Sequence, residues 1–185
     1  GLQDSLSENV RIRLLMKAGR GHDAALLAEE ASRRALRADN KQAALALLET
    51  ALALSSPYTG SSEWAPLFLQ TVNEICRLRL NLIRDIHDIP ALLEQAYPVA
   101  ERIGDLRTLT RCDLVMGLYK YVIGQTAEGF RLIGSGLSRA DALGDDDILA
   151  ISAEFRGVYY YLQGTYKEAV DSCEIVVRQS RLKSG

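Results

Sequence analysis

The sequence predicts an all-α solenoid built from antiparallel helix hairpins, and three observations support this fold class. Residues 144–177 repeat residues 104–137 at a constant offset of 40 positions (144 − 104). A fixed period of this size is typical of stacked hairpins, each of which buries its apolar face on a neighbour. Apolar residues elsewhere recur at helical spacings of three and four, and no convincing run alternates with period two, so almost no strand is expected. The identical pairs at the offset include Gly104 and Gly144, Gly117 and Gly157, Tyr119 and Tyr159, Tyr121 and Tyr161, Gly124 and Gly164, and Glu128 and Glu168.

The first hairpin is expected at residues 23–54, after a helix that begins near residue 10. Residues 5–8 read Ser-Leu-Ser-Glu, a capping box that predicts the start of that earlier helix. Within the hairpin, Asp39 and Gln42 form a second capping pattern, in which Asp39 accepts from free amides and Gln42 reaches back. A polar loop follows, and the same helical pattern then resumes. We therefore expect an inserted loop within a single domain, residues 1–185.

The second hairpin is expected at residues 64–103. Asp88 is the predicted cap of its second helix, and Pro90 falls in the first turn, where a missing amide hydrogen has no cost. Pro98 lies inside that helix, removes one hydrogen bond and should bend it.

The third and fourth hairpins, residues 106–143 and 147–181, are the two copies of the repeat. Gly124 and Gly164 follow the first helix of each copy. Glycine adopts the left-handed conformation that ends many helices, so these two residues are expected to close those helices.

The composition is that of a soluble folded protein, because 48% of the 185 residues are hydrophobic and 25% are charged. The net charge is −2 with both signs interspersed, so no direct binding to nucleic acid is expected. No run approaches the roughly 20 apolar residues of a membrane span, and the N-terminus lacks the order of a signal peptide. These features predict a cytoplasmic protein without a membrane contact.

Two further expectations concern the cysteines and the chain ends. Cys76, Cys112 and Cys173 lie far apart in apolar helical stretches, which predicts buried free thiols. The chain stops soon after an apolar helix, whereas the terminal repeat of a solenoid usually has a polar outer face. The sequence is therefore expected to be a fragment of a longer protein.

The last hairpin resembles the tetratricopeptide repeat, in which small residues at two positions let the paired helices touch and an aromatic residue lies between them. The residues that carry this resemblance are Gly157, Tyr160, Gly164, Tyr166 and Ala169. The resemblance implies a right-handed superhelix of hairpins with a period of about 40 residues. The sequence departs from the family at Cys76 and Arg156, where leucine is usual, at Lys120, where tyrosine is usual, and in a period longer than about 34 residues.

A narrower resemblance covers more of the chain. Residues 17–25, Lys-Ala-Gly-Arg-Gly-His-Asp-Ala-Ala, and the alanine-rich residues 43–52 are similar to the helical repeats that follow the nucleotide-binding module of large bacterial signalling ATPases. These include LuxR-type activators of the maltose-activator kind and proteins with adenylate cyclase or kinase domains. The resemblance implies that any enzymatic or DNA-binding part lies on residues outside this sequence.

No motif predicts catalysis, a cofactor or a metal. The phosphate-loop pattern GxxxxGK[ST] is absent. His87 stands between carboxylates that are better explained as helix caps, and His22-Asp23 is better explained as a helix start. The chain is therefore not expected to be an enzyme.

The resemblance places the partner site on the first helix of each hairpin, because these helices line the concave wall in tetratricopeptide repeats. The residues expected to face that groove are Arg111, Leu114, Leu118, Tyr121, Glu154, Val158 and Tyr161. Tyr119 and Tyr159 are expected to fill gaps between hairpins instead. Exposed tyrosines suit recognition because they combine a large apolar area with a polar tip.

Two functions remain open from the sequence. The first is a protein-interaction or signal-relay scaffold within a larger bacterial regulatory ATPase or transcription regulator, whose partner is a protein segment or another domain of the same chain. The second is a small-molecule sensing domain of a LuxR-type activator. A peptide groove would be open and mixed in charge, whereas a small-molecule site should be a closed, mainly apolar pocket. The sequence leaves the oligomeric state open.

Overall fold

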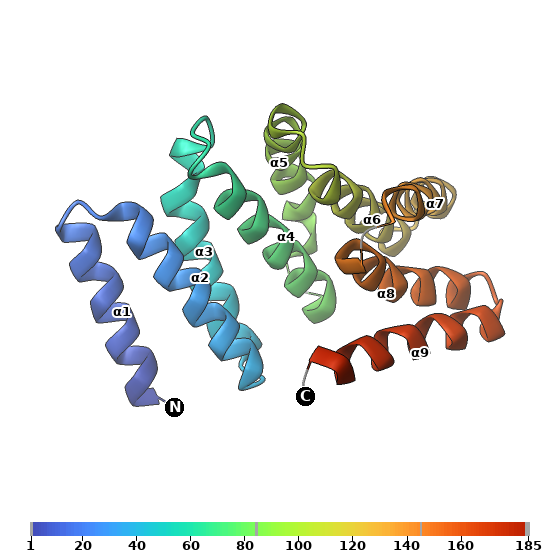
Figure 1. The fold of residues 1–185 in the computed structure, drawn as a ribbon, viewed down its shortest axis with the longest axis horizontal. Coiled ribbons are helices and arrows are strands. Elements are labelled where there is room, and N and C mark those ends of the chain that lie inside the picture. The colour runs from blue at the N-terminus through green and yellow to red at the C-terminus, as the bar shows by residue number, and fades with distance from the viewer. Residues whose placement is uncertain (1, 84, 145, 184–185) are drawn as a thin grey trace. The chain divides into compact units, whose positions relative to one another are not determined.

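The computed structural model describes residues 2–83, 85–144 and 146–183 (Figure 1). Over these residues it contains nine α-helices, two short 3-10 helices and no strand, so the all-α prediction is confirmed. The helices form two compact units, residues 1–104 and 105–185. A continuous right-handed solenoid over both units stays a prediction. No helix in the described ranges is both long and apolar enough to cross a membrane.

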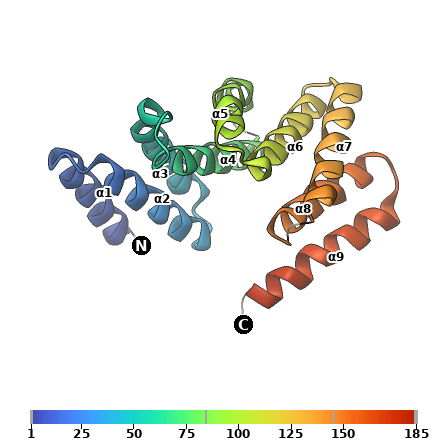
Figure 2. The ribbon, with the colours of Figure 1, turned by 45° about the horizontal axis from the view of Figure 1, so that its top comes forward.

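The first unit is a succession of neighbouring helices. Each of α1 to α4 contacts the helix that follows it, and α1, α2 and α3 lie in a row (Figure 2). The residue ranges are α1 (Leu2–Lys17), α2 (Gly21–Arg37), α3 (Lys41–Ser55), η1 (Ser56–Tyr58), α4 (Ala65–Leu82), η2 (Ile86–Asp88) and α5 (Ile89–Ile103).

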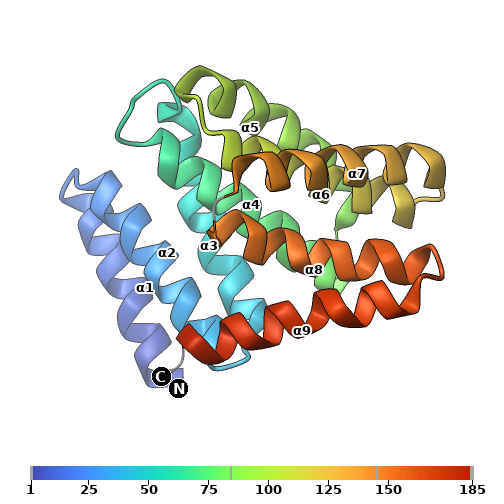
Figure 3. The same ribbon diagram turned by 45° about the vertical axis from the view of Figure 1, so that its right-hand side comes forward.

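The second unit consists of two hairpins. Helix α6 pairs with α7 and α8 pairs with α9, and Figure 3 shows α8 and α9 side by side and antiparallel. Helix α8 also packs on α7 and contacts α6. The residue ranges are α6 (Leu106–Val122), α7 (Thr126–Leu143), α8 (Asp146–Leu162) and α9 (Tyr166–Lys183). Gly124 and Gly164 have φ of +86° and +78°, which confirms that they take the left-handed conformation after the first helix of each hairpin.

The two predicted capping boxes of the first unit are wrong. Helix α1 begins at Leu2, so Glu8 lies inside it and pairs with Arg34 of α2, at 2.9 Å from its Nε atom. At the start of α3 the cap is Asn40, whose Oδ1 atom accepts from the backbone N–H of Ala43 at 3.1 Å. Asp39 instead takes a positive φ of 54°, a conformation that a short polar side chain tolerates.

The start of α5 agrees with the sequence only in part. Pro90 lies in the first turn as predicted. Asp88 stands at the cap position, but its side chain makes no capping hydrogen bond and accepts from Arg79 at 3.1 Å instead. The helix continues through Pro98 to Ile103.

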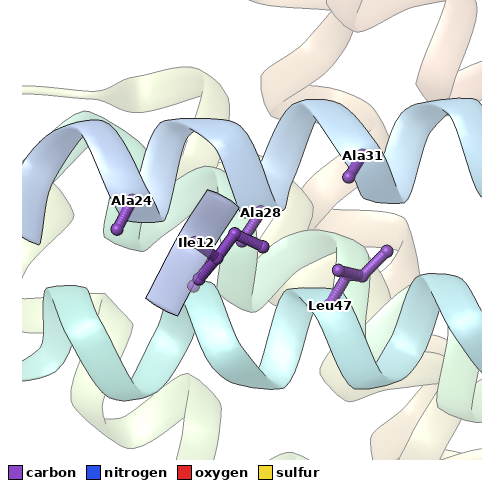
Figure 4. Packing of buried hydrophobic residues seen from close by; sticks show 6 residues of the cluster. Ile12, Ala24, Ala28, Ala31 and Leu47 are labelled. Carbon is purple, nitrogen blue, oxygen red and sulfur yellow. The ribbon is translucent and has the colours of Figure 1, made fainter. Parts of the chain in front are cut away.

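Small residues of α2 bring α1 and α3 close together. Ala24, Ala28 and Ala31 form a buried stripe, and Ile12 of α1 and Leu47 of α3 lie against it (Figure 4). Full burial of one such large aliphatic side chain stabilises the fold by about 1.5–3 kcal/mol. The alanine stripe thus lets two larger side chains fill the space between three helices.

In the second unit, α6 and α7 touch through glycine. A Cβ atom added at Gly117 would lie 2.8 Å from the backbone nitrogen of Ile133 and 2.9 Å from the carbonyl oxygen of Gly129. A Cβ atom at Gly129 would lie 2.7 Å from the carbonyl oxygen of Gly117. The equivalent site in the α8–α9 hairpin is looser, because a Cβ atom at Gly157 would lie 3.0 Å from the Sγ atom of Cys173 and 3.6 Å from the nearest backbone atom, the carbonyl oxygen of Ala169.

Candidate functional site

An open apolar trough runs between α8 and α9, with a volume of about 820 Å³. We call it the α8–α9 trough. Its apolar walls are Val158 and Tyr161 of α8 and Tyr166, Val170 and Val177 of α9. Gly157 and Ala169, both buried, lie where the two helices are closest. Small residues at that position hold the helices together and leave the larger side chains on the rim.

Helical spacing explains why these side chains share one face. On α9, residues 166, 170 and 177 are separated by four and seven positions, which correspond to about one and two turns. On α8, Gly157 and Tyr161 are one turn apart. The trough is therefore a property of two adjacent helix faces and is set by the local sequence of each.

The walls of the trough are unusually exposed for apolar side chains. Tyr161 and Tyr166 are each 63% exposed, Val170 57% and Val177 48%. The two tyrosine rings lie edge to face, with centroids 5.8 Å apart. A contiguous exposed apolar patch of this kind marks an interaction surface more often than scattered apolar residues do.

Charge is nearly absent from the trough. Of the nine described residues that line it, Glu174 alone is an acidic or basic residue. Cys173 also lies there and is exposed, so the prediction of a buried thiol is wrong for this residue but right for Cys76 and Cys112. The reason is that no described helix covers this face of α9, whereas the faces carrying Cys76 and Cys112 are packed.

On α8, the structure brings two of the three predicted site residues together. Val158 and Tyr161 line the trough. Glu154 is exposed on the same helix but is not part of the lining.

On α6, the predicted site residues lie deeper. Leu114 is completely buried, and a Cβ atom at Gly136 of α7 would lie 2.9 Å from its Cδ2 atom. The prediction that Leu114 faces a groove is therefore wrong, because α7 packs directly on the Leu114 side chain. Arg111 and Leu118 are half-buried. Tyr121 is half-buried with its ring centroid 5.6 Å from that of Phe130.

The two tyrosines expected to fill gaps do lie in packed positions. Tyr159 of α8 places its ring edge to face on Phe130 of α7, with centroids 5.6 Å apart. It therefore packs between the two hairpins of the second unit. Tyr119 is buried.

Sequence reasoning missed the half of the trough that belongs to α9. Tyr166, Val170 and Val177 were not assigned to the site, because the family resemblance places the groove on first helices only. The signal that could have found them is the apolar stripe at helical spacing on α9.

A second group of polar residues lies in the first unit, around Glu29 of α2. Its side chain is buried, pairs with Arg33 and accepts from Nε2 of Gln70 at 2.7 Å. Burial raises the pKa of Glu29 above its ordinary value, Glu74 and Glu30 add to the rise, and Arg33 opposes it. This arrangement joins α2 to α4 and makes the carboxyl group sensitive to pH.

The histidines lie outside any cluster of metal ligands. His22 is in the first turn of α2, where its ring contacts Trp64 at 4.8 Å and its Nδ1 atom lies 3.3 Å from Glu63. His87 is exposed in η2. Among the residues whose placement is described, no group of three or more histidine, cysteine or acidic side chains is arranged to hold a metal ion.

Comparison with known proteins does not assign the chain to a family. No protein-family model matches it, and a search of curated proteins found no match either. The function is therefore inferred from the site and from the resemblance in the sequence.

Proposed function

We propose that this chain is a non-catalytic helical scaffold that binds a protein segment through the α8–α9 trough. The observation that supports this most directly is the pair of exposed tyrosines, Tyr161 and Tyr166, at the mouth of an apolar surface. Tyrosine is enriched among the residues that dominate binding energy, because it buries a large area at a small loss of conformational entropy. Val170 and Val177 extend that area along α9.

The biological setting rests on the resemblance of residues 17–25 and 43–52 to repeats of bacterial signalling ATPases and LuxR-type regulators. In this proposal the chain is part of a tetratricopeptide-like superhelix in a cytoplasmic regulator and relays a signal. The partner is then another protein or another domain of the same chain.

A small-molecule ligand is the second candidate, and one observation favours it. The volume of about 820 Å³ falls within the range of roughly 300–1,000 Å³ that is usual for ligand pockets, and the walls are apolar with one ionisable residue, Glu174. Native mass spectrometry of the purified chain distinguishes this candidate. A bound metabolite that is lost from a Tyr161→Ala variant would favour the sensor function over the scaffold.

The test of the scaffold function compares two variants in partner capture followed by calorimetry. The double variant Tyr161→Ala/Tyr166→Ala removes the mouth of the trough, and Tyr58→Ala removes a tyrosine outside the trough that is 54% exposed. For a partner captured by the parent chain, we expect the double variant to lose at least about 2 kcal/mol of binding free energy, or about 30-fold in Kd. Tyr58→Ala should bind as the parent does. Full-strength binding by a correctly folded double variant would exclude the trough as the binding site.

A further inference from the structure

The two hairpins of the second unit can be compared to ask what the α8–α9 trough binds. The 40-residue repeat places an equivalent face on the α6–α7 hairpin. At three of the four compared positions on α7 the side chain is a larger apolar one than its equivalent on α9. The equivalent pairs are Tyr121 and Tyr161, Phe130 and Val170, Ile133 and Cys173, Gly134 and Glu174, and Leu137 and Val177.

The two equivalent faces differ in how exposed their side chains are. Ile133 and Leu137 on α7 are buried, but their counterparts Cys173 and Val177 on α9 are exposed. The equivalent tyrosines also differ, because Tyr121 is half-buried and Tyr161 is 63% exposed. The helix that packs on the α6–α7 hairpin is α8, which contacts both α6 and α7.

The contacts of α8 define the kind of helix that fits. Tyr159 reaches Phe130 with its ring, and its hydroxyl oxygen lies 3.8 Å from where a Cβ atom of Gly134 would stand. Arg156 pairs with Asp141 at 2.5 Å. Phe155 lies one turn before Tyr159 and Ile148 lies three turns before it, and both are buried. Helix α8 therefore presents apolar residues on one face, followed by an aromatic residue with a polar tip.

We propose that the α8–α9 trough binds an amphipathic α-helix of a protein partner, laid on it as α8 is laid on the α6–α7 hairpin. This inference rests on the proposed protein-binding function and names the partner's chemistry. Recognition of an apolar helix face by a hydrophobic groove is a recurrent mode of protein binding. The partner helix carries apolar residues at the spacing of Ile148 and Phe155, followed by a residue that occupies the place of Tyr159.

One position distinguishes this partner from α8 itself. Glu174 stands where the α6–α7 hairpin has Gly134, which is the position that the Tyr159 hydroxyl approaches. A partner residue at that place meets a carboxylate side chain, whereas Tyr159 of α8 approaches a glycine.

The probe for this proposal is a peptide of residues 146–162, held helical by a lactam bridge between Glu154 and a lysine that replaces Val158. Both bridge positions are outside the face that meets α7, since Val158 lines the trough and Glu154 is exposed. The bridge is needed because an isolated helix of this length is only marginally stable in water. Circular dichroism establishes that the peptide is helical before it is used.

Cys173 supplies the readout, because it lies in the trough and is exposed. Cys76 and Cys112 are buried, and burial raises the pKa of the Cys112 thiol to about 12, so neither should compete for a maleimide at neutral pH. In the intact 185-residue chain, a saturating amount of the helical peptide should slow the labelling of Cys173 at least tenfold.

Matched variants separate specific docking from general stickiness. Val170→Asp places a charge in the trough, whereas Val122→Asp makes the same change at an exposed valine of α6 outside it. The peptide should protect Cys173 in the Val122→Asp chain but not in the Val170→Asp chain. A peptide with Phe155→Asp, equally helical, should give no protection.

Three results would overturn the proposal. They are unchanged labelling with the helical parent peptide, equal protection by the Phe155→Asp peptide, and protection that grows with the concentration of the chain alone, which would assign the trough to a second copy. Failure of the helix inference is distinguishable from failure of the scaffold function. If the peptide does not protect Cys173 but Tyr161→Ala/Tyr166→Ala still weakens partner binding, the trough binds a protein in another form.

Discussion

The close contact of α6 and α7 predicts opposite effects for the same substitution at two equivalent glycines. In a Gly117→Ala variant the new methyl group would lie 2.8 Å from the backbone nitrogen of Ile133 and 2.9 Å from the carbonyl oxygen of Gly129. Backbone atoms move only if the two helices separate. In a Gly157→Ala variant the nearest atom is the Sγ atom of Cys173 at 3.0 Å, which belongs to an exposed side chain that rotates away easily.

The magnitude follows from two opposing effects. Replacing glycine by alanine inside a helix stabilises it by about 0.8–1.0 kcal/mol. Overpacking a tight contact costs about 1–3 kcal/mol, and backbone contacts as short as those at Gly117 belong at the upper end. We therefore expect Gly117→Ala to lose about 1–2 kcal/mol of unfolding free energy and Gly157→Ala to gain up to about 1 kcal/mol.

Urea titration followed by far-ultraviolet circular dichroism measures both variants against the parent. In a thermal scan, 1 kcal/mol corresponds to about 2–4 °C in Tm for a chain of this size. The two variants should therefore differ by about 2–12 °C, with Gly157→Ala the more stable. If Gly117→Ala is as stable as the parent, or if Gly157→Ala is the weaker of the two, the close backbone contact between α6 and α7 is wrong.

The remaining predictions concern the first unit. Asn40→Ala removes the cap of α3 and should cost about 1 kcal/mol in urea titration, whereas Gln42→Ala, the residue that the sequence pattern favoured, should stay within about 0.5 kcal/mol of the parent. The reverse order would restore the predicted capping box. Because burial raises the pKa of Glu29 above its ordinary value of 4.5, its protonation stabilises the fold at low pH, and this stability is lost as pH rises through the raised pKa. Glu29→Gln should therefore be more stable relative to the parent at pH 7.5 than at pH 4.5, and the same difference at both pH values would contradict this role of burial.

Much of the helix order could be predicted from the sequence because its signals are strong and local. The turn glycines Gly124 and Gly164 require a positive φ that other residues avoid, so each fixes the end of a helix. The spacing of apolar residues between these glycines then predicts a helix and not a strand. The 40-residue repeat adds independent support, since two stretches with the same pattern form the same hairpin.

The helix caps were less predictable because neighbouring residues compete for one role. Asp39 and Asn40 both have a side-chain oxygen that could accept from the first free amides of α3. The structure decides between them through the end of the preceding helix. Asp39 takes the left-handed conformation there, which leaves Asn40 as the residue next to α3.

The site was predictable only in the part that depends on one helix. Val158 and Tyr161 were assigned through the resemblance to the tetratricopeptide repeat, which places the groove on the first helix of each hairpin. Leu114 shows the limit of that reasoning, because whether it faces solvent depends on how closely α7 approaches, and that distance is set by Gly136 on another helix. The walls contributed by α9 depend in the same way on which of its faces is covered.

The two copies of the repeat also differ in a way that bears on the trough. Where α7 has Phe130, Ile133, Gly134 and Leu137, α9 has Val170, Cys173, Glu174 and Val177. Each apolar side chain is replaced by a smaller one, and a charge appears where there was none. A face that stays covered gains stability from the largest apolar side chains, whereas a face exposed until a partner arrives gains solubility from less apolar area and one charge. The changes on α9 follow the second pattern, while Tyr161 is retained and Tyr166 replaces Thr126 at the mouth. That combination favours a surface that binds its partner reversibly over one that is buried permanently. A helical peptide added in solution, which can bind and dissociate, is therefore a suitable probe of this trough.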